Sequence, residues 1–439
     1  MTVSANERVI ADEQARHWRK RKLKFVSDVL TSNVDKHIVE GEAAVRLCNY
    51  TDVYYHEEIT PDMPFMQGSA TESEIERFGL KKGQVLLTKD SESWEDIAVP
   101  AYVSETMPEV VCGYHLAVIE PDSGEVDGRF LSWLAQSPVL NDQFKLSAKG
   151  VTRFGLSQHA LKNAVIDVPP LEYQLKAAAF LDRKTAEIDT LIAKKRRLLD
   201  RLAEKRTALI THAVTKGLNP DAPMKDSGIE WLGEIPAHWE TGVPIKYLVK
   251  MSGGMTPSTS NPLYWDGDIP WVSPKDMKRT ELFDAQDHVT ELALSETGLS
   301  LVEPGSVLIV VRGMILAHSF PVAINRVPVV LNQDMKALKV GPRLSSEYFA
   351  LLLRAITDVM LALVESSAHG TKALRTDRWK ELLIALPPVE EQDTIVALVE
   401  KTVAELDSLE DATGKTIGKL EEYRSALITN AVTGQIKVA

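Results

Sequence analysis

A gapless internal repeat constrains this chain more than any other feature of its sequence. Residues 169–216 align with residues 387–434 at a constant offset of 218, and 19 of the 48 aligned positions are identical. Both copies begin with Pro-Pro and close with Ala-Leu-Ile-Thr-x-Ala-Val-Thr. A match of this length implies one structural element used twice, so the region before each copy should also be a repeated module. The sequence therefore predicts a chain with two heads.

Both copies of the repeat have the pattern of a long helix. Proline at the first positions, acid in the first turn and no internal proline or glycine from Leu171 to Lys216 are typical of helices. Apolar residues recur at spacings of 3, 4 and 7. A helix of about 45 residues is about 65 Å long and exceeds a globular core, which favours a coiled-coil seam. Gly414 and Gly418 lower the helix propensity of the second copy, where a kink could form.

The regions before the two helices repeat more loosely. Each starts with His-Trp (His17-Trp18 and His238-Trp239) and later has a charged turn, a glycine and a β-rich run, at residues 81–87 and 303–309. Short strands with turn signals and a few helices predict an α+β fold. The expected organisation is a first head at 1–168, a central repeat helix at 169–218, a Pro/Gly/Asp-rich linker at 219–234, a second head at 235–386 and a C-terminal repeat helix at 387–439.

Composition limits the class of protein. A chain of 439 residues should hold two or more domains, because single cores rarely grow beyond about 250–300 residues. No stretch approaches the roughly 20 apolar residues that span a bilayer, so no membrane partner is expected. Met1 to Ala15 lacks the apolar region of a secretory signal. Cys48 and Cys112 are too few for a disulfide scaffold or a four-cysteine zinc site. We expect a cytoplasmic protein.

Charge is distributed unevenly. The net charge of −12 argues, taken alone, against a protein that coats nucleic acid. Residues 169–218 nevertheless hold 11 Lys and Arg against 6 Asp and Glu, whereas 387–439 hold 5 against 10. The two helices therefore carry opposite net charge, which fits a pairing between them.

Full antiparallel overlap of the helices would bring specific charges together. In that register Lys194, Lys195, Arg196 and Arg197 face a segment with Glu410 and Asp411, and Arg183 and Lys184 face Glu421 and Glu422. Exposed pairs each contribute under about 1 kcal/mol but could fix orientation and register. The alternative is that these charges only solvate exposed helix faces.

No catalytic constellation is visible in the sequence. Gly414-Lys415-Thr416 resembles the end of a P-loop, but Leu409 stands where the upstream glycine is required. The segment Asp167-Val168-Pro169-Pro170-Leu171 departs from the amino-methyltransferase motif by an inserted Val and a missing aromatic residue. The ten histidines show no ligand-like spacing. We expect no catalytic residue, no metal and no cofactor in this chain.

Three features taken in order carry a family resemblance. Both helices open with Pro-Pro-x-Glu-x-Gln (residues 169–174 and 387–392), both end with the shared Ala-Leu-Ile-Thr motif, and Gly-Glu-Ile-Pro-Ala-His-Trp (233–239) opens the second half. This set resembles the specificity (S) subunit of type I restriction-modification systems. The resemblance implies two target-recognition domains, joined by two long helices that form an antiparallel coiled coil with pseudo-two-fold symmetry. Each domain would read one half of a split sequence in double-stranded DNA.

The resemblance also implies partners. Family members bind two methyltransferase (M) subunits, which carry S-adenosylmethionine, and motor-nuclease (R) subunits join for restriction. The chain would then choose the site while its partners modify or cut it. Because the heads differ strongly in sequence, the target should be asymmetric. Polar and basic residues near the loop before each helix suit phosphates or base edges: Lys149, Thr152 and Arg153 in the first head, and Lys372, Arg375 and Arg378 in the second.

Two further basic residues are candidates for DNA contact, and the residues and the chain each have alternative interpretations. Lys89 and Arg312 follow the β-rich runs and are second-tier DNA-binding candidates. For every candidate, an ordinary surface role is the alternative. For the chain, the alternatives are an S subunit of a system that cuts on both sides of its site, a coiled-coil adaptor whose heads bind proteins, and an enzyme with an unrecognised site. The net acidity favours the adaptor, whereas the duplicated helix signatures weigh against it.

Overall fold

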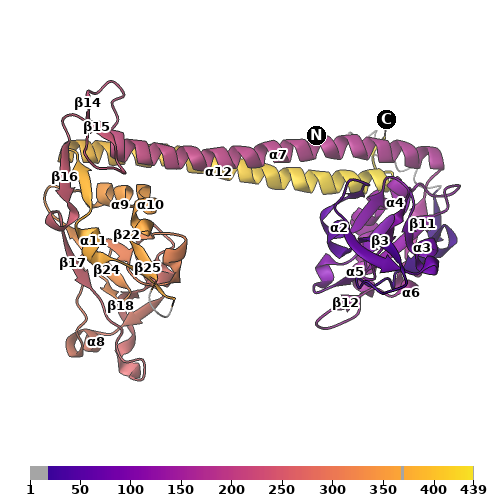
Figure 1. The fold of residues 1–439 in the computed structure, drawn as a ribbon, viewed down its shortest axis with the longest axis horizontal. Coiled ribbons are helices and arrows are strands. Elements are labelled where there is room, and N and C mark those ends of the chain that lie inside the picture. Colours follow the sequence, from indigo (N-terminus) through magenta and orange to yellow (C-terminus); the bar gives the residue numbers. More distant parts are fainter. Residues whose placement is uncertain (1–17, 367–369, 439) are drawn as a thin grey trace. The chain divides into compact units, whose positions relative to one another are not determined.

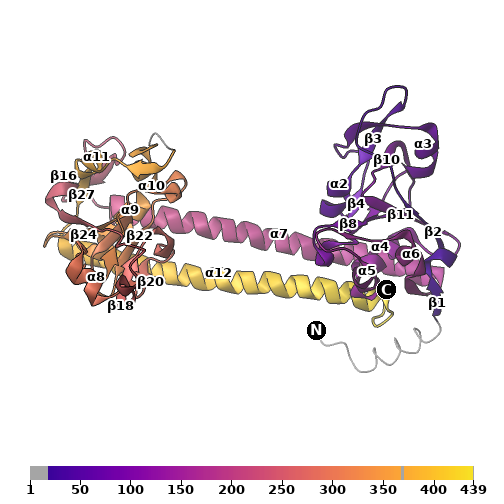
Figure 2. The same ribbon diagram turned by 90° about the horizontal axis from the view of Figure 1, so that it is seen from below.

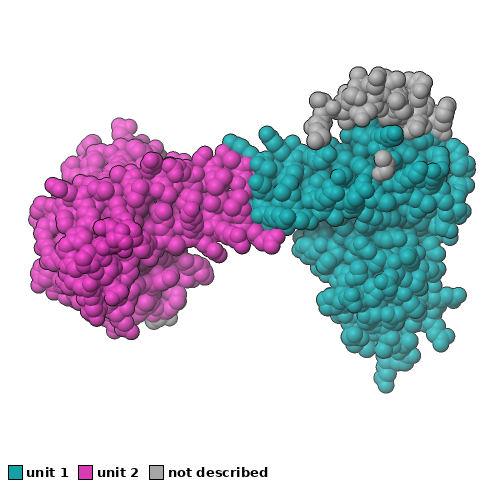
Figure 3. All heavy atoms as spheres, turned by 90° about the horizontal axis from the view of Figure 1, so that it is seen from above, with its two compact units in different colours: residues 1–196, 414–439 teal, residues 197–413 magenta. Residues whose placement is uncertain are grey.

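The chain divides into two compact units in a computed structural model that describes residues 18–366 and 370–438. One unit comprises residues 1–196 and 414–439, and the other comprises 197–413 (Figure 3). Each unit contains one head and a stretch of both repeat helices. The N-terminal segment Met1 to Ala15 and His17 of the first His-Trp pair lie outside the described residues.

The two repeat segments are long helices (Figure 1). Helix α7 spans Leu171–Lys216 and helix α12 spans Val389–Val432, each beginning directly after the Pro-Pro pair. Helix α12 continues through Gly414 and Gly418 without interruption. Gly217 and Gly434, just beyond the two helix ends, have φ of +75° and +73°. This left-handed conformation is the one in which glycine commonly ends a helix.

The first head is built on two sheets (Figure 2). A five-stranded sheet has the order β2-β11-β7-β9-β4 and a four-stranded sheet the order β5-β3-β10-β6, while β1 pairs with β13 and β8 with β12. The strands are β1 (Arg19–Lys22), β2 (Ser27–Thr31), β3 (Ala43–Cys48), β4 (Glu58–Ile59), β5 (Met66–Ala70), β6 (Gly79–Leu80), β7 (Val85–Thr88), β8 (Asp90–Ser91), β9 (Pro100–Val103), β10 (Met107–Cys112), β11 (Leu116–Pro121), β12 (Phe154–Gly155) and β13 (Val165–Val168). The helices are α2 (Tyr50–Tyr55), α3 (Glu72–Phe78), α4 (Gly128–Gln136), α5 (Pro138–Ser147) and α6 (Gln158–Asn163).

The second head repeats the five-stranded sheet in the order β17-β24-β21-β22-β19 and adds a three-stranded sheet, β20-β18-β23. Three two-stranded ladders, β14-β15, β16-β27 and β25-β26, complete it. The strands are β14 (Met224–Asp226), β15 (Glu234–Pro236), β16 (Glu240–Pro244), β17 (Val249–Gly253), β18 (Trp265–Val272), β19 (Glu281–Leu282), β20 (Asp287–Val289), β21 (Val307–Val310), β22 (Val322–Asn325), β23 (Val330–Leu331), β24 (Met335–Val340), β25 (Val364–Ser366), β26 (Lys372–Leu374) and β27 (Leu383–Leu386). The helices are α8 (Glu291–Glu296), α9 (Ser346–Ala355), α10 (Thr357–Ala362) and α11 (Thr376–Lys380).

The two heads share one frame and differ in what is added to it. In both five-stranded sheets the central strand, β7 or β21, is wholly buried, and the last pair is parallel. These central strands contain the β-rich runs matched in the sequence. The ladders β1-β13 and β16-β27 also correspond. The second sheets, β5-β3-β10-β6 and β20-β18-β23, do not. The predicted α+β fold with a duplicated head is therefore confirmed.

One buried glutamine anchors each helix to its own head. Gln174 accepts a hydrogen bond from the Asp127 amide at the start of α4 (2.8 Å) and donates to the carbonyls of Glu125 and Pro169. In the second head Gln392 accepts from the Ser345 amide at the start of α9 (2.8 Å). It donates to the carbonyls of Arg343 and Pro387. The Pro-Pro-x-Glu-x-Gln motif is thus the joint between head and helix.

Within each unit the helix stretches run antiparallel, but in a different register from full overlap. In the first unit Asp189 lies 2.9 Å from Arg424 and Arg196 lies 3.1 Å from Glu421, and in the second unit Arg206 lies 2.6 Å from Asp407. The pairing is displaced by about two turns, because the first turns of each helix pack on their own head. The expected facing of Lys194, Lys195, Arg196 and Arg197 with Glu410 and Asp411, and of Arg183 and Lys184 with Glu421 and Glu422, is corrected accordingly: Arg196 meets Glu421, and Lys184 pairs with Glu187 of its own helix.

The segment expected to be a linker, 219–234, is a folded part of the second head. Strands β14 and β15 form a hairpin, and Ile229 and Leu232 are buried in the core of that head. Lys216 at the end of α7 donates to the Leu232 carbonyl (3.1 Å). The proline and glycine content of this segment suggested a linker. Its apolar residues nevertheless pack into the core of the second head, because burying them removes apolar surface from water.

Candidate nucleic-acid interface

In the first head the structure brings the two groups of candidates together. The loop from Lys149 to Gly155 closes on itself through paired backbone hydrogen bonds of 2.9 and 3.1 Å. Its strand β12 pairs with β8, and the Leu156 amide donates to the Lys89 carbonyl (2.8 Å). Thr152 and Arg153 are exposed at the tip. The loop before the helix and the residue after the central strand therefore form one surface.

The cations of this surface are held by neighbouring polar groups. Lys89 lies 2.6 Å from Asp90, which also contacts the His115 ring at 2.8 Å. Burial raises the pKa of Asp90, but hydrogen bonds from His115 and Lys89 outweigh it and hold the pKa below its usual range. An Arg153 nitrogen lies 2.9 Å from the His115 ring nitrogens. His115 and Asp90 escaped the sequence analysis because only the pairing of β8 with β12 brings them to the loop.

A cavity of about 730 Å³ adjoins these residues. Its aromatic wall includes Tyr50 and Tyr54 of α2, whose rings stack with centroids 5.4 Å apart. Tyr54 donates to Asp96 (2.5 Å), and this hydrogen bond raises the pKa of the Tyr54 hydroxyl to about 12. Thr152 and Arg153 also line it. Aromatic faces can stack on bases, carboxylates can accept from base amino groups, and arginine can donate to phosphate or guanine.

The second head has the equivalent arrangement. The hairpin of β25 and β26 lies against the turn after β21, because the Gly313 amide donates to the Lys372 carbonyl (2.9 Å) and the Leu374 amide to the Val311 carbonyl (2.9 Å). This places Lys372 beside the turn that carries Arg312. In both heads, therefore, a loop preceding the helix meets the segment after the central strand. His369, directly before Gly370 in the loop that precedes β26, lies outside the described residues.

Acidic side chains also hold two of the four candidate cations of the second head. Arg312 pairs with Asp334 (2.6 Å), and Arg375 pairs with Asp377 (2.7 Å) and Glu365 (2.9 Å). Hydrogen bonds to these carboxylates raise the pKa of Arg375 above its usual range. Lys372 donates to Ser366 (2.8 Å), and Arg378 is exposed on α11.

Two further kinds of feature are absent from the described part of the chain. It holds no cluster of His, Cys, Asp and Glu side chains that could bind a metal ion. None of its helices combines the length and apolar character needed to cross a membrane. The two cysteines are buried, free thiols.

Comparison with known proteins identifies the family. Residues 44–200 and 236–417 match the model of the type I restriction modification DNA specificity domain. The chain is 30% identical over 212 residues to the specificity subunit of the type I restriction enzyme EcoR124I/EcoR124II from Escherichia coli, covering 47% of this chain and 49% of that one. It is 31% identical over 173 residues to the MjaIX specificity subunit of Methanocaldococcus jannaschii, covering 38% of each. The matches thus span about half, or less, of these curated relatives.

Solved structures show the same fold over nearly the whole chain. The HsdS subunit from Thermoanaerobacter tengcongensis has a TM-score of 0.59 at 16% identity, covering 95% of this chain and 97% of that one. A chain solved in work on complex assembly and conformational transition of the type I R-M system has a TM-score of 0.67 at 17% identity, covering 94% and 97%. Together with the two matched stretches, this confirms the resemblance: the chain belongs to the family of type I restriction-modification DNA specificity domains and carries that domain twice.

Proposed function

We propose that this chain is the sequence-recognition subunit of a type I restriction-modification complex and reads an asymmetric, bipartite DNA site. The observation that carries the proposal is the duplicated interface, in which each head sets a polar loop beside the turn after its central strand. The frame that positions these loops is common to both heads, whereas the added sheets differ. Two differing surfaces on a repeated frame suit two different half-sites.

The proposal gives the catalytic steps to partners. Two methyltransferase subunits would carry S-adenosylmethionine, motor-nuclease subunits would join for restriction, and this chain would act in the cytoplasm without a cofactor of its own. Two equivalent exposed leucines, Leu191 on α7 (41% exposed) and Leu409 on α12 (46%), occupy identical positions of the repeat. Equivalent exposed apolar positions on both helices suit two copies of one partner.

The acidic balance of the chain is compatible with DNA binding in such a complex. Lys89, Arg312 and Arg375 each pair with a carboxylate of their own head. Phosphate neutralisation dominates affinity for DNA, and partner subunits could supply much of it. The heads would then contribute specificity more than affinity. Their carboxylates would have to be displaced, or would themselves accept from base amino groups.

Co-expression with a candidate methyltransferase subunit and sequencing of modified bases tests the proposal. We expect methylation at one sequence made of two unlike half-sites. Arg153→Ala should impair recognition of one half-site and Lys372→Ala that of the other, whereas Arg201→Ala, an exposed control on α7, should leave both unchanged. Co-purification without DNA-dependent methylation would favour the protein-binding adaptor instead. Cleavage mapping would separate a system that cuts on both sides of its site.

A further inference from the structure

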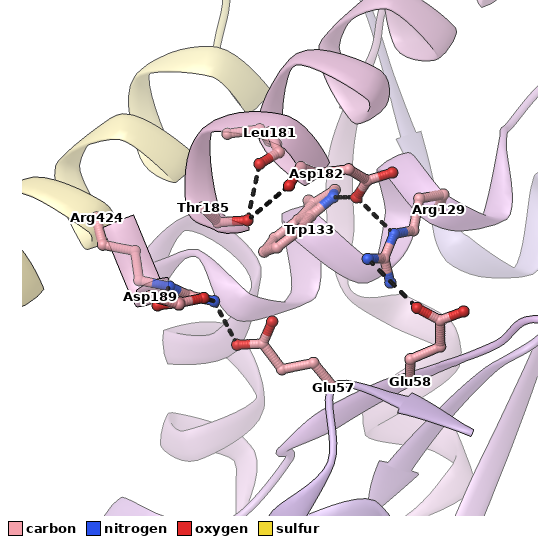
Figure 4. Close-up of polar contacts among 9 residues, drawn as sticks. All are labelled: Glu57, Glu58, Arg129, Trp133, Leu181, Asp182, Thr185, Asp189 and Arg424. Carbon is pink, nitrogen blue, oxygen red and sulfur yellow. Dashed lines mark hydrogen bonds and ion pairs between the residues drawn. The ribbon is translucent and has the colours of Figure 1, made fainter. Parts of the chain in front are cut away.

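An arginine of α12 joins the helix pair to the first head (Figure 4). Arg424 contacts Asp189 of α7 at 2.9 Å and Glu57, in the loop before β4, at 2.5 Å. Its guanidinium lies 5.8 Å from the ring centroid of Trp133 on α4. Only 17% of its side chain is exposed. One side chain therefore links both helices to the sheet and to the α4 helix of this head.

A second arginine completes this junction from the side of the head. Arg129 of α4 contacts Asp182 of α7 at 2.7 Å, and its guanidinium lies 5.0 Å from the Trp133 ring and 5.1 Å from the Tyr102 ring. The Trp133 indole donates to Asp182 (2.9 Å) and is 2% exposed. A partly buried, hydrogen-bonded charge pair is screened less than a surface pair. At this point the first head is thus fixed to the helices by ion pairs, a hydrogen bond and aromatic contacts.

The repeat supplies a matched comparison in the second head. Arg206 and Asp407 stand 218 positions before and after Arg424 and Asp189, and they form the same inter-helix pair at 2.6 Å. The corresponding loop position, before β19, is Thr280 and offers no carboxylate. In α9 the residue at the position of Trp133 is Leu351.

At the corresponding position of the second head the side chains border an open space. A cavity of about 600 Å³ lies between the second head and its stretch of the helix pair, and its lining includes Arg206, Thr280, Leu351, Arg354, Glu400 and Asp407. Arg326, within the head, holds the nearby carboxylates Glu281 (2.6 Å) and Glu347 (3.0 Å). The aligned arginines therefore differ in one respect: Arg424 forms an ion pair with its head, whereas Arg206 forms its ion pair with Asp407 of the other helix.

We propose that Arg424, Glu57 and Trp133 are positioning residues that fix the orientation of the first head, whereas the cavity leaves the second head freer to adjust to the spacer between half-sites. This inference rests on the proposed function, because it concerns how a bipartite site is measured. The first head would anchor the complex on its half-site. The second would accept a small change in the distance or rotation of the other half-site.

The test compares Arg424→Ala with Arg206→Ala in the full chain bound to its methyltransferase partner. The two variants remove equivalent inter-helix ion pairs, and only Arg424→Ala also removes an ion pair with a head. Methylation rates are measured on DNA with the preferred spacer and with one base pair added or removed. Loss of an ion pair and a cation–π contact should raise the relative rate on altered spacers by about threefold to tenfold for Arg424→Ala. Arg206→Ala should leave the relative rates within about twofold.

Two further variants separate positioning from a general loss of structure. Glu57→Ala keeps the pair of Arg424 with Asp189 and should broaden spacer tolerance as Arg424→Ala does. Leu351→Trp places an indole at the cavity of the second head and should narrow the range of spacers that is tolerated. Half-site sequences should stay unchanged in all variants. Equal spacer profiles for Arg424→Ala and Arg206→Ala, or altered half-sites, would overturn the inference.

Hydrogen exchange without DNA keeps this test independent of the proposed function. Arg424→Ala should raise exchange in β4 and α4, whereas Arg206→Ala should change little in β19 and α9. If the wild-type chain directs no methylation at a bipartite site, the proposed function fails, and the exchange comparison still decides whether the first junction is the tighter one. Equal exchange changes in both heads would refute the tighter junction.

Discussion

Replacing the buried glutamine that fastens one helix to its head should destabilise only the unit that contains that glutamine. Gln174 and Gln392 are fully buried, and each makes three hydrogen bonds to backbone groups. Replacing either with Ala leaves one amide and two carbonyls without that partner. At about 1 kcal/mol net for each bond, the expected loss is about 3 kcal/mol. For a unit of about 200 residues this corresponds to a fall in Tm of about 6–12 °C.

Differential scanning calorimetry with hydrogen exchange measures this effect. Gln174→Ala should lower the unfolding transition of the unit that contains the first head and expose the Asp127 amide to exchange. Gln392→Ala should do the same for the second unit and the Ser345 amide. Gln67→Ala, at an exposed position of β5, is the control. A shift within about 1 °C in both joint variants would refute the conclusion that these glutamines fasten helix to head.

Three other predictions concern the helices and the heads. Four residues inserted after Lys194 and after Lys419 should lengthen the helix pair by about 6 Å and lengthen the preferred spacer by about two base pairs. Methylome sequencing should show unchanged half-sites, and altered half-sites would contradict the idea that the helix pair sets the spacer length. Asp377, whose pKa the hydrogen bond from Arg375 lowers to about 2, stays ionised at pH 7 and holds that cation. Asp377→Asn should therefore raise non-specific DNA affinity about threefold in anisotropy titrations, with a steeper salt dependence; Arg375→Ala should cancel the gain. The lowered pKa of Asp90 adds stability above the unfolded value of about 3.9, which is lost as pH falls through the folded pKa. Acid titration of thermal stability should show this loss in the wild type and not in Asp90→Asn.

Local signals predicted the elements of the frame. The Pro-Pro pairs and the repeat gave the helix starts to within two residues, and the runs at 81–87 and 303–309 contain the central strands β7 and β21. Each of these features depends on neighbours in sequence, as helix caps and buried strand runs do.

The helix register and the partners of the candidate cations depend on contacts between residues far apart in the sequence, so the sequence did not predict them. The register of the helices depends on Gln174 and Gln392, whose partners lie 47 positions away, so charge counting with full overlap misplaced it. Lys89 was selected as a second-tier DNA-binding candidate, but its side chain pairs with Asp90, which the His115 ring also contacts. The aromatic wall had an available signal, because Tyr50 and Tyr54 are four apart and share one face of a helix.

The residues that are identical in the two copies of the repeat fall into groups with different contacts. Gln174 and Gln392 bind each helix to its head, and the pairs Asp189–Arg424 and Asp407–Arg206 bind the helices to each other. Intramolecular contacts thus explain these identities. They do not explain Leu191 and Leu409, which are exposed at equivalent positions. Their recurrence at one position of the repeat is consistent with the proposed docking of two copies of one partner, because such a partner would contact equivalent positions of the two helices.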